Sequence, residues 1–219
     1  MIDSFLRNIA PHYCCGCEER GVFLCQSCEN DIVSERFSYC VRCLSPSVTS
    51  NICAACKPSY SKAWCVSIRD EIMEKIVNAY KFDRVYEALE ISARLLSRTL
   101  PSLPRDMIIV PIPTVPKHIR IRGYDHTRQM AIHIARQHGV RYAPLVSRRT
   151  NSVQLNASRP VRIRQAQEAF HVQPLEGGRY LIIDDVYTTG STVEYASLQL
   201  RRAGAGEVWV AVLSRQLLD

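Results

Sequence analysis

Two adjacent carboxylates followed by a hydroxyl-rich loop are the residues of this chain best suited to do chemistry. Asp184 and Asp185 come directly after the apolar run 180–183, and four hydroxyl side chains surround one glycine in 188–192. Amide and hydroxyl groups in such a loop donate hydrogen bonds to an anion, and glycine lets the backbone approach it closely. The carboxylates suit a sugar diol, or a hydrated Mg²⁺ held on a phosphorylated substrate. The sequence therefore predicts an anion site beside an acid pair.

The residues on either side indicate which elements position this site. The run 180–183 is β-branched and aromatic, as in a buried parallel strand. The helix predicted after Gly190 has one apolar face, formed by Val193, Ala196, Leu200 and Ala203. This order of elements is typical of the carboxyl edge of an open α/β sheet, where the helix dipole favours a bound anion. The alternative is a chance acid pair before a helix cap.

A second basic segment follows another predicted strand. The apolar run 107–113 is closed by two prolines, and the next residues carry basic or imidazole side chains: Lys117, His118, Arg120 and Arg122. A helix is predicted over 125–138. We expect this basic segment to be a loop. Because it lies between a strand and a helix N-terminus, we interpret it as a second anion site rather than as an ordinary basic surface.

Residues 147–167 are polar, irregular and rich in arginine, with no acid before Glu168. The arginines are Arg148, Arg149, Arg159, Arg162 and Arg164. A segment with so few apolar side chains cannot bury enough apolar surface to stay packed on the domain. We predict a mobile lid that becomes ordered when an anion arrives.

All ten cysteines lie in the first 65 residues. Eight of them form four Cys-x-x-Cys pairs: Cys14 and Cys17, Cys25 and Cys28, Cys40 and Cys43, and Cys53 and Cys56. Two such pairs complete one tetrahedral site, so two structural Zn²⁺ ions are predicted. A Cys₄ iron–sulfur cluster is the alternative, because sulfur ligands do not separate the two metals. Sequential pairing is the simpler assignment, although the spacing also allows a cross-brace.

The remaining readings of the cysteines are weaker. A disulfide framework needs an export signal that the sequence lacks, and a redox role for one pair leaves three pairs unexplained. Cys15 and Cys65 are left over, and Cys65 is expected in the core because it lies in the apolar run 64–68.

Length and composition suit one α/β domain, 63–219, with a cysteine-rich element at 1–62. The formal charge is +7; two Cys₄–zinc sites at −2 each would reduce it to +3. Clustered arginines therefore fit an anionic small substrate as well as nucleic acid. No apolar run could span a membrane and no basic leader is present, so a cytoplasmic location is expected. Residues 1–10 are predicted to form a short amphipathic helix.

Periodicity predicts the other elements of the domain. Helices are expected over 69–80 and 85–100, the second ended by Pro101 and Pro104. Short apolar runs indicate strands over 64–68, 143–146 and 207–213, and the chain is expected to return to the fold at 170–172. The predicted fold class is an open, mostly parallel α/β sheet with a small N-terminal cysteine-rich element.

The segment 182–192 resembles the phosphoribosyl-pyrophosphate (PRPP) motif of the type I phosphoribosyltransferases. In that superfamily the apolar residues form the strand. The resemblance implies that Asp184 and Asp185 are the catalytic acids, which contact the ribose hydroxyls. It also implies that the loop binds the 5′-phosphate through Thr188, Thr189, Gly190, Ser191 and Thr192.

Nearly the whole chain resembles the ComF family (competence protein F, amidophosphoribosyltransferase-like), which joins a cysteine-rich zinc element to a type I phosphoribosyltransferase domain. Residues 110–113 and 122–124 match its second signature. That match implies a pyrophosphate site formed by Lys117, Arg120, Arg122, Gly123 and Tyr124. The third signature is matched by Gln154, Arg162, Ala169 and Phe170, and it implies a mobile loop that includes Arg149, Gln154 and Arg162.

The chain departs from the family pattern at two places. Asp125 and His126 stand where the family usually has Asn-Gln, and Gln165 stands where asparagine is usual. These departures affect the expected geometry around the leaving group rather than the fold.

The resemblance implies that a nitrogen or similar nucleophile displaces pyrophosphate from PRPP. Such a reaction passes through a cationic, oxocarbenium-like sugar and needs no covalent nucleophile. It requires Mg²⁺ and cations on the departing pyrophosphate, with carboxylates near the developing positive charge. The acceptor pocket has no recognisable signature, and the family's link to competence suggests a role in DNA uptake.

Two other classes of function remain open: a PRPP or nucleotide sensor without turnover, and an accessory protein that binds single-stranded DNA or DNA-uptake proteins. The lid has no aromatic side chain between Ser147 and Glu168, which argues against a base-stacking surface there. The cysteine-rich region could contribute aromatic side chains instead: Phe23, Phe37 and Tyr39. Assembly as a homo-oligomer is also left open.

Overall fold

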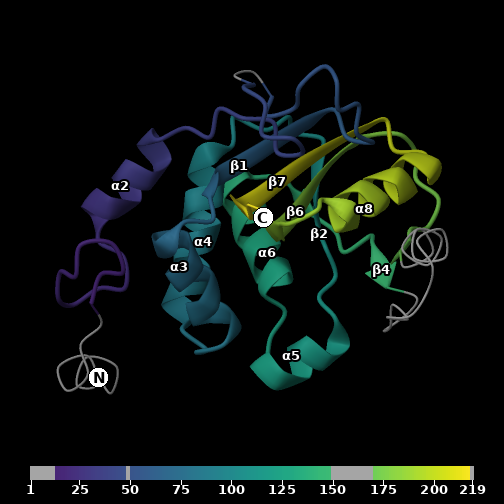
Figure 1. Cartoon of the computed structure of the whole chain (residues 1–219). Helices are drawn as coiled ribbons and strands as arrows, with labels where there is room; N and C mark the ends of the chain where they lie inside the picture. The colour runs from purple at the N-terminus through teal and green to yellow at the C-terminus, as the bar shows by residue number, and fades with distance from the viewer. Residues whose placement is uncertain (1–12, 48–49, 149–169, 218–219) are drawn as a thin grey trace, which may run out of the picture.

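The computed structural model describes residues 13–47, 50–148 and 170–217, and its centre is a five-stranded sheet (Figure 1). In order across the sheet the strands are β1 (Lys62–Ile68), β7 (Glu207–Arg215), β6 (Arg179–Tyr187), β2 (Met107–Pro111) and β3 (Arg141–Tyr142). Each neighbouring pair is parallel. The predicted open parallel sheet is therefore confirmed.

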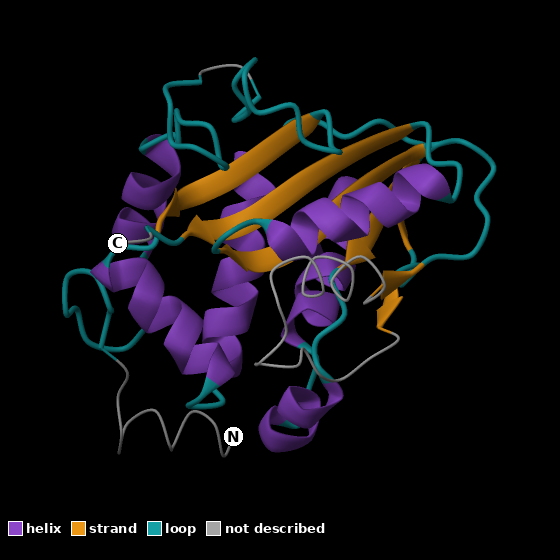
Figure 2. Cartoon of the chain, turned by 45° about the vertical axis from the view of Figure 1, so that its right-hand side comes forward, coloured by secondary structure: helices purple, strands orange, loops and turns teal. Residues whose placement is uncertain are grey.

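Helices cover both faces of the sheet (Figures 1 and 2). On one face lie α3 (Glu71–Lys81), α4 (Tyr86–Thr99) and α6 (His126–His138), and on the other lies α8 (Ser191–Arg202). The side chains of β7 alternate between the two apolar cores: Trp209, Ala211 and Leu213 pack with the three helices, and Val208, Val210 and Val212 pack with α8. Burial on both faces explains why the strands are almost continuously apolar.

The helices predicted over 69–80, 85–100 and 125–138 are confirmed to within two residues at each end. Asp70 caps α3 by accepting the amide hydrogen of Met73 at 2.8 Å, and Asp125 caps α6 by accepting that of Arg128 at 3.1 Å. Gly139 ends α6 in the left-handed conformation, at φ 64°. Among the described residues, no helix is long and apolar enough to cross a membrane.

Two local predictions were wrong. Residues 143–146 form no strand, because Pro144 has no N–H to continue a ladder; β3 ends before it, and β4 (Ser147–Arg148) pairs antiparallel with β5 (Phe170–His171) instead. The basic segment expected as a loop is a short helix, α5 (Pro116–Arg122), which begins with proline and ends at Gly123. The predicted helix over 1–10 and the lid residues Arg149, Gln154 and Arg162 lie outside the described residues.

The cysteine-rich element packs against both cores and contains a helix that the sequence did not predict, α2 (Gln26–Ser34). Its first half contributes Cys14, Leu24 and Cys25 to the core beneath α3 and α4. Its second half contributes Phe37 and Val41 to the core beneath α8. The element therefore covers parts of both faces of the fold. Cys65 lies in β1 and is 1% exposed, which confirms its expected place in the core.

Candidate functional site

The acid pair lies near the carboxyl end of β6 and is buried, with Asp184 8% and Asp185 6% exposed. Three donors meet on one oxygen of Asp185: Lys81 Nζ lies 2.6 Å, His126 Nε2 2.8 Å and the Tyr80 hydroxyl 3.2 Å from Oδ2. The other oxygen, Oδ1, accepts the amide hydrogen of Val186 at 2.7 Å. Both oxygens of Asp185 are thus held by protein donors.

Sequence reasoning missed the three partners of Asp185. Tyr80 and Lys81 end α3, and His126 begins α6, so the contacts join segments far apart in the chain. The one available signal was His126, which stands where the family resemblance leads to an expectation of glutamine. Lys81 carried no signal beyond its place in the last turn of a helix.

Asp184 is in a different state from its neighbour. Burial, and then the charge of Asp185, raise the pKa of Asp184 to about 7. Burial also acts to raise the pKa of Asp185, but the hydrogen bond from His126 and the charge of Lys81 outweigh it and hold that pKa well below its usual range. Asp184 Oδ1 accepts the Asp185 amide hydrogen at 2.9 Å, and Oδ2 has no hydrogen bond to a described residue. Asp184 is therefore the acid with an oxygen left for a ligand.

Arg148, in β4, is the described arginine of the predicted lid segment that interacts with the acid pair. Burial lowers its pKa, and the charge of Asp184 opposes that effect. Its Nε donates to the carbonyl of Pro113 at 3.0 Å, and its guanidinium carbon lies 5.1 Å from the ring centre of Phe170. These contacts anchor Arg148 beside the end of β2.

The hydroxyl loop joins β6 to α8, as predicted. Gly190 is the residue before α8, with φ 76°, and a Cβ placed there would lie 2.0 Å from the Tyr187 hydroxyl. Thr188, Thr189 and Ser191 are exposed, and the hydroxyls of the last two lie 2.9 Å apart. The Arg215 guanidinium contacts the start of the loop, where it donates to the carbonyls of Tyr187 at 3.2 Å and Thr188 at 2.7 Å. Exposed donors at the start of a twelve-residue helix suit an anion.

The predicted pyrophosphate residues lie in different surroundings. Arg122 is joined to the acid pair through His126, with 3.2 Å between Arg122 Nη1 and His126 Nδ1. Lys117 and Arg120 are exposed on α5 and form no ion pair with a described acid. Tyr124 is buried; its hydroxyl donates to the carbonyl of Tyr80 and its ring lies 4.8 Å from that of Tyr86. Gly123 ends the helix at φ 87°.

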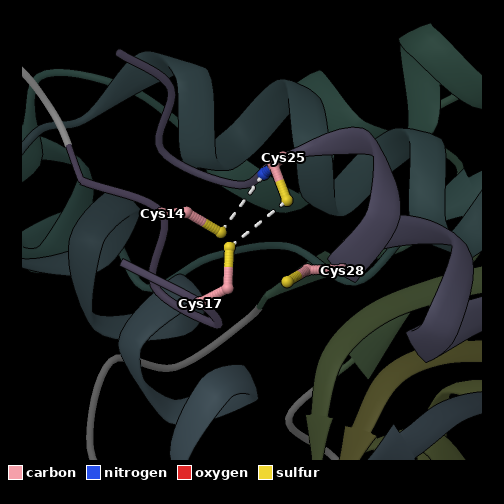
Figure 3. Close-up of side chains that lie close together, drawn as sticks. All are labelled: Cys14, Cys17, Cys25 and Cys28. Carbon is pink, nitrogen blue, oxygen red and sulfur yellow. Dashed lines mark hydrogen bonds between the residues drawn. The ribbon is translucent and has the colours of Figure 1, made fainter. Parts of the chain in front are cut away.

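The eight paired cysteines form two clusters in sequential order, and within each cluster the sulfur atoms lie within 4.8 Å of one another: Cys14, Cys17, Cys25 and Cys28, and then Cys40, Cys43, Cys53 and Cys56. Figure 3 shows the first cluster, in which the Cys17 and Cys25 sulfurs are 3.6 Å apart. Four sulfurs bound at about 2.3 Å to one tetrahedral zinc lie about 3.8 Å apart, so both clusters have the size of a zinc site.

The surroundings of the cysteines also suit metal ligation. Burial acts to raise the pKa of Cys14, but backbone N–H groups, including that of Cys25 at 3.3 Å, outweigh it and lower that pKa to about 6. The hydroxyl and amide of Ser45 lower the pKa of Cys43 to about 6. One thiol in each cluster is thus ionised near neutral pH.

The second cysteine cluster is joined to the hydroxyl loop. Glu194, in the first turns of α8, accepts from the Ser59 hydroxyl at 2.7 Å and from the Ser59 amide at 3.1 Å. Arg42, between Cys40 and Cys43, donates to the Cys56 carbonyl at 3.3 Å and lies 4.0 Å from Glu194. The hydroxyls of Tyr60 and Tyr187 are 3.1 Å apart. The residues that follow Cys56 therefore contact both ends of the loop.

Curated relatives match almost the full length of the chain. It is 30% identical over 207 residues to the DNA utilization protein YhgH of Salmonella typhi, covering 89% of this chain and 91% of that protein. It is 26% identical over 208 residues to competence protein F of Haemophilus influenzae, covering 88% and 90%. No model of a protein family matches the sequence.

Two solved structures are similar to parts of the chain. Adenine phosphoribosyltransferase from Thermoanaerobacter pseudethanolicus aligns with 61% of this chain and 83% of its own, at 14% identity and a TM-score of 0.39. UMP synthase from Leishmania donovani aligns with 65% of this chain and 24% of its own, at 20% identity and a TM-score of 0.38.

Proposed function

Because this chain belongs to the ComF family of competence and DNA utilization proteins, we propose that it binds PRPP with Mg²⁺ and transfers the phosphoribosyl group to a nucleophile, releasing pyrophosphate. The observation that carries the proposal is the arrangement around β6: a buried acid pair is followed directly by an exposed hydroxyl loop that opens α8. The hydroxyl loop follows the acid pair directly in the chain, so the two together suit the 5′-phosphate and the 2′,3′-diol of one ribose.

Each group has a role in this proposal. Asp184, with a free oxygen, accepts from the ribose hydroxyls, while Asp185 is held by Lys81 and His126. The loop hydroxyls and amides bind the 5′-phosphate. Arg122, together with the exposed cations Lys117 and Arg120, binds the leaving pyrophosphate. As the bond between the ribose C1 and the pyrophosphate oxygen breaks, positive charge grows on the ribose ring. The buried carboxylates stabilise this charge.

Two metals belong to the proposal. Structural Zn²⁺ would be held by the two cysteine clusters, whose sulfur spacing fits it. Mg²⁺ would arrive on the phosphates of PRPP and supply charge neutralisation for the leaving group. We further propose that the chain acts in DNA uptake or utilization, in line with the names of its relatives.

The test is to titrate the protein with PRPP, with and without Mg²⁺, and to measure the binding by calorimetry. We expect Mg²⁺-dependent binding that falls at least about tenfold in Asp184→Asn, since a hydrogen bond to a charged group is lost. Arg202→Ala removes an exposed cation at the far end of α8 and should bind PRPP normally. Equal PRPP affinity in the wild type and in Asp184→Asn would contradict the assignment of the diol.

The names of the relatives also favour a second candidate, binding of single-stranded DNA, with or without PRPP turnover. In that case the cations of α5, Lys117, Arg120 and Arg122, would contact successive DNA phosphates, so the affinity should fall steeply with salt. Arg122→Ala separates the two functions. Loss of PRPP binding with DNA binding intact supports the transferase, and the opposite result supports the DNA-binding protein.

A further inference from the structure

His126 is the meeting point of three elements at the site. It is 5% exposed, at the first position of α6. Its Nε2 lies 2.8 Å from Asp185 Oδ2 on β6, and its Nδ1 lies 3.2 Å from Arg122 Nη1 on α5. Its ring stacks on Tyr80 of α3, with ring centres 5.5 Å apart and 29° between the planes. His126 thus lies within hydrogen-bonding distance of both Arg122 and Asp185.

The chemistry of these two partners sets the hydrogen-bond directions. A guanidinium can only donate, so Nδ1 of His126 must accept from Arg122. The ring proton then lies on Nε2 and is donated to the Asp185 carboxylate, which can only accept. His126 therefore accepts at one end of its ring and donates at the other.

We infer that His126 is a positioning residue that fixes Arg122 and Asp185 relative to one another, so that the pyrophosphate and ribose ends of one ligand are recognised together. This inference rests on the proposed function. Without the imidazole, Arg122 keeps a contact with the Phe82 ring, at 5.8 Å, but no link to the acids. Asp185 keeps Lys81 and Tyr80 but loses the contact that ties it to α5.

The inference also explains the departure from the family pattern at this position. A glutamine amide, like this ring, has one acceptor and one donor group at the end of its side chain. Either residue can therefore accept from Arg122 and donate to Asp185. A methionine has a similar length but provides neither hydrogen bond.

The experiment compares PRPP binding, with Mg²⁺, in the wild type, His126→Gln and His126→Met. We expect His126→Gln to stay within about threefold of the wild type and His126→Met to lose at least about tenfold. Binding of inorganic phosphate to the loop before α8 should be the same in all three. Similar losses in both variants, or no loss in either, would overturn the inference.

A spectroscopic measurement makes the test independent of the variants' folding. The ¹⁵N signals of His126 in the wild type should show a proton on Nε2 and none on Nδ1, and the Nδ1 signal should shift in Arg122→Ala. A proton on Nδ1 in the wild type would overturn the inference. If the wild type binds no PRPP while the Nε2–H tautomer is observed, the proposed function fails but the contacts of His126 stand.

Discussion

At the scale of single residues, the two adjacent acids do different work. Asp185 is an ionised anchor, held by a lysine and a histidine from two helices, whereas Asp184 has a pKa near neutrality and one oxygen without a protein donor. A strand alternates its side chains between faces, so neighbours on β6 meet different surroundings. The pair is therefore a buried support and a ligand-binding group rather than two equivalent carboxylates.

We predict opposite effects on stability when each acid is replaced. The folded pKa of Asp184 is about 7, above its ordinary value of 3.8. The folded protein therefore binds a proton on this carboxyl group more tightly than the unfolded chain does. The stability that this proton provides is lost as the pH rises through the folded pKa. Asp184→Asn should then be more stable than the wild type at pH 8, by about 1–3 kcal/mol, and similar to it near pH 4. Urea unfolding at both pH values measures this.

Asp185→Asn should be less stable by about 3 kcal/mol at pH 7, because Lys81 would lose its carboxylate in a mostly buried position. The folded pKa of Asp185 is depressed, so its stabilisation is present above pH 4 and is lost as the pH falls further. Equal unfolding free energies for the two variants at pH 8 would show that the acids share one environment.

A second prediction concerns Gly190. Alanine there combines a left-handed φ of 76° with a Cβ only 2.0 Å from the Tyr187 hydroxyl. We expect Gly190→Ala to abolish phosphate binding by the loop and to cost about 2–4 kcal/mol of stability. Gly139→Ala is the matched control, since its φ is 64° and no atom lies within 4 Å of the new Cβ. It should cost about 1 kcal/mol and leave phosphate binding intact.

The local motifs were predictable from the sequence because their chemistry is contiguous. Residues 184–192 carry an acid pair, a glycine and hydroxyls in one run, and a strand and a helix flank them as expected. The partners of Asp185 were not predictable, because Lys81 and His126 reach it only through the packing of α3 and α6 on the sheet. Pairings of that kind depend on tertiary geometry, which side-chain periodicity does not encode.

At the scale of elements, the two cysteine clusters support different parts of the molecule. The first cluster leads into α2, whose buried Glu29 pairs with Arg94 at 2.8 Å and Arg98 at 3.1 Å on α4. The second leads to Ser59 and Tyr60, which hold Glu194 and Tyr187 on either side of the hydroxyl loop. Metal in the second cluster should therefore stiffen the predicted phosphate site.

A third prediction follows. Cys53→Ser and Cys17→Ser each remove one ligand from one cluster, so each variant should hold about one zinc per chain, whereas the wild type should hold two. In hydrogen exchange, Cys53→Ser should expose the amides of 188–194 and weaken phosphate binding several-fold, and Cys17→Ser should expose those of α2 only. Iron in the wild-type protein, or equal exchange patterns in the two variants, would contradict the prediction.

At the scale of the whole molecule, the cysteine-rich element contributes to both cores and is more than an appendage. It supplies Cys14 and Leu24 to one core and Phe37 and Val41 to the other. Composition placed a boundary near residue 62 because the paired cysteines end shortly before it, but composition does not report which side chains pack across such a boundary.

Our fourth prediction is that a chain beginning at Ser61 will not fold cooperatively. Without the cysteine-rich element, apolar surface is uncovered on both faces of the sheet. In addition, β1 loses the 2.9 Å hydrogen bond that the Ala63 amide donates to the Ser50 carbonyl. A chain beginning at Tyr13 keeps every described contact and is the control. Calorimetry of the two purified proteins is the measurement. A single sharp transition for the shorter chain, near that of the control, would contradict this expectation.

The pairing of β1 with β7 has a consequence for how the chain reaches its structure during synthesis. Trp64 lies beside Ala211 and Ile68 beside Arg215, so the sheet partner of β1 leaves the ribosome long after β1 itself. Until then β1 is an apolar strand with an unpaired backbone, and late pairing of distant segments is slow. The nascent chain should therefore depend on chaperones until residues 207–215 emerge. Stalled chains that end near Arg202 should be bound by a holdase chaperone.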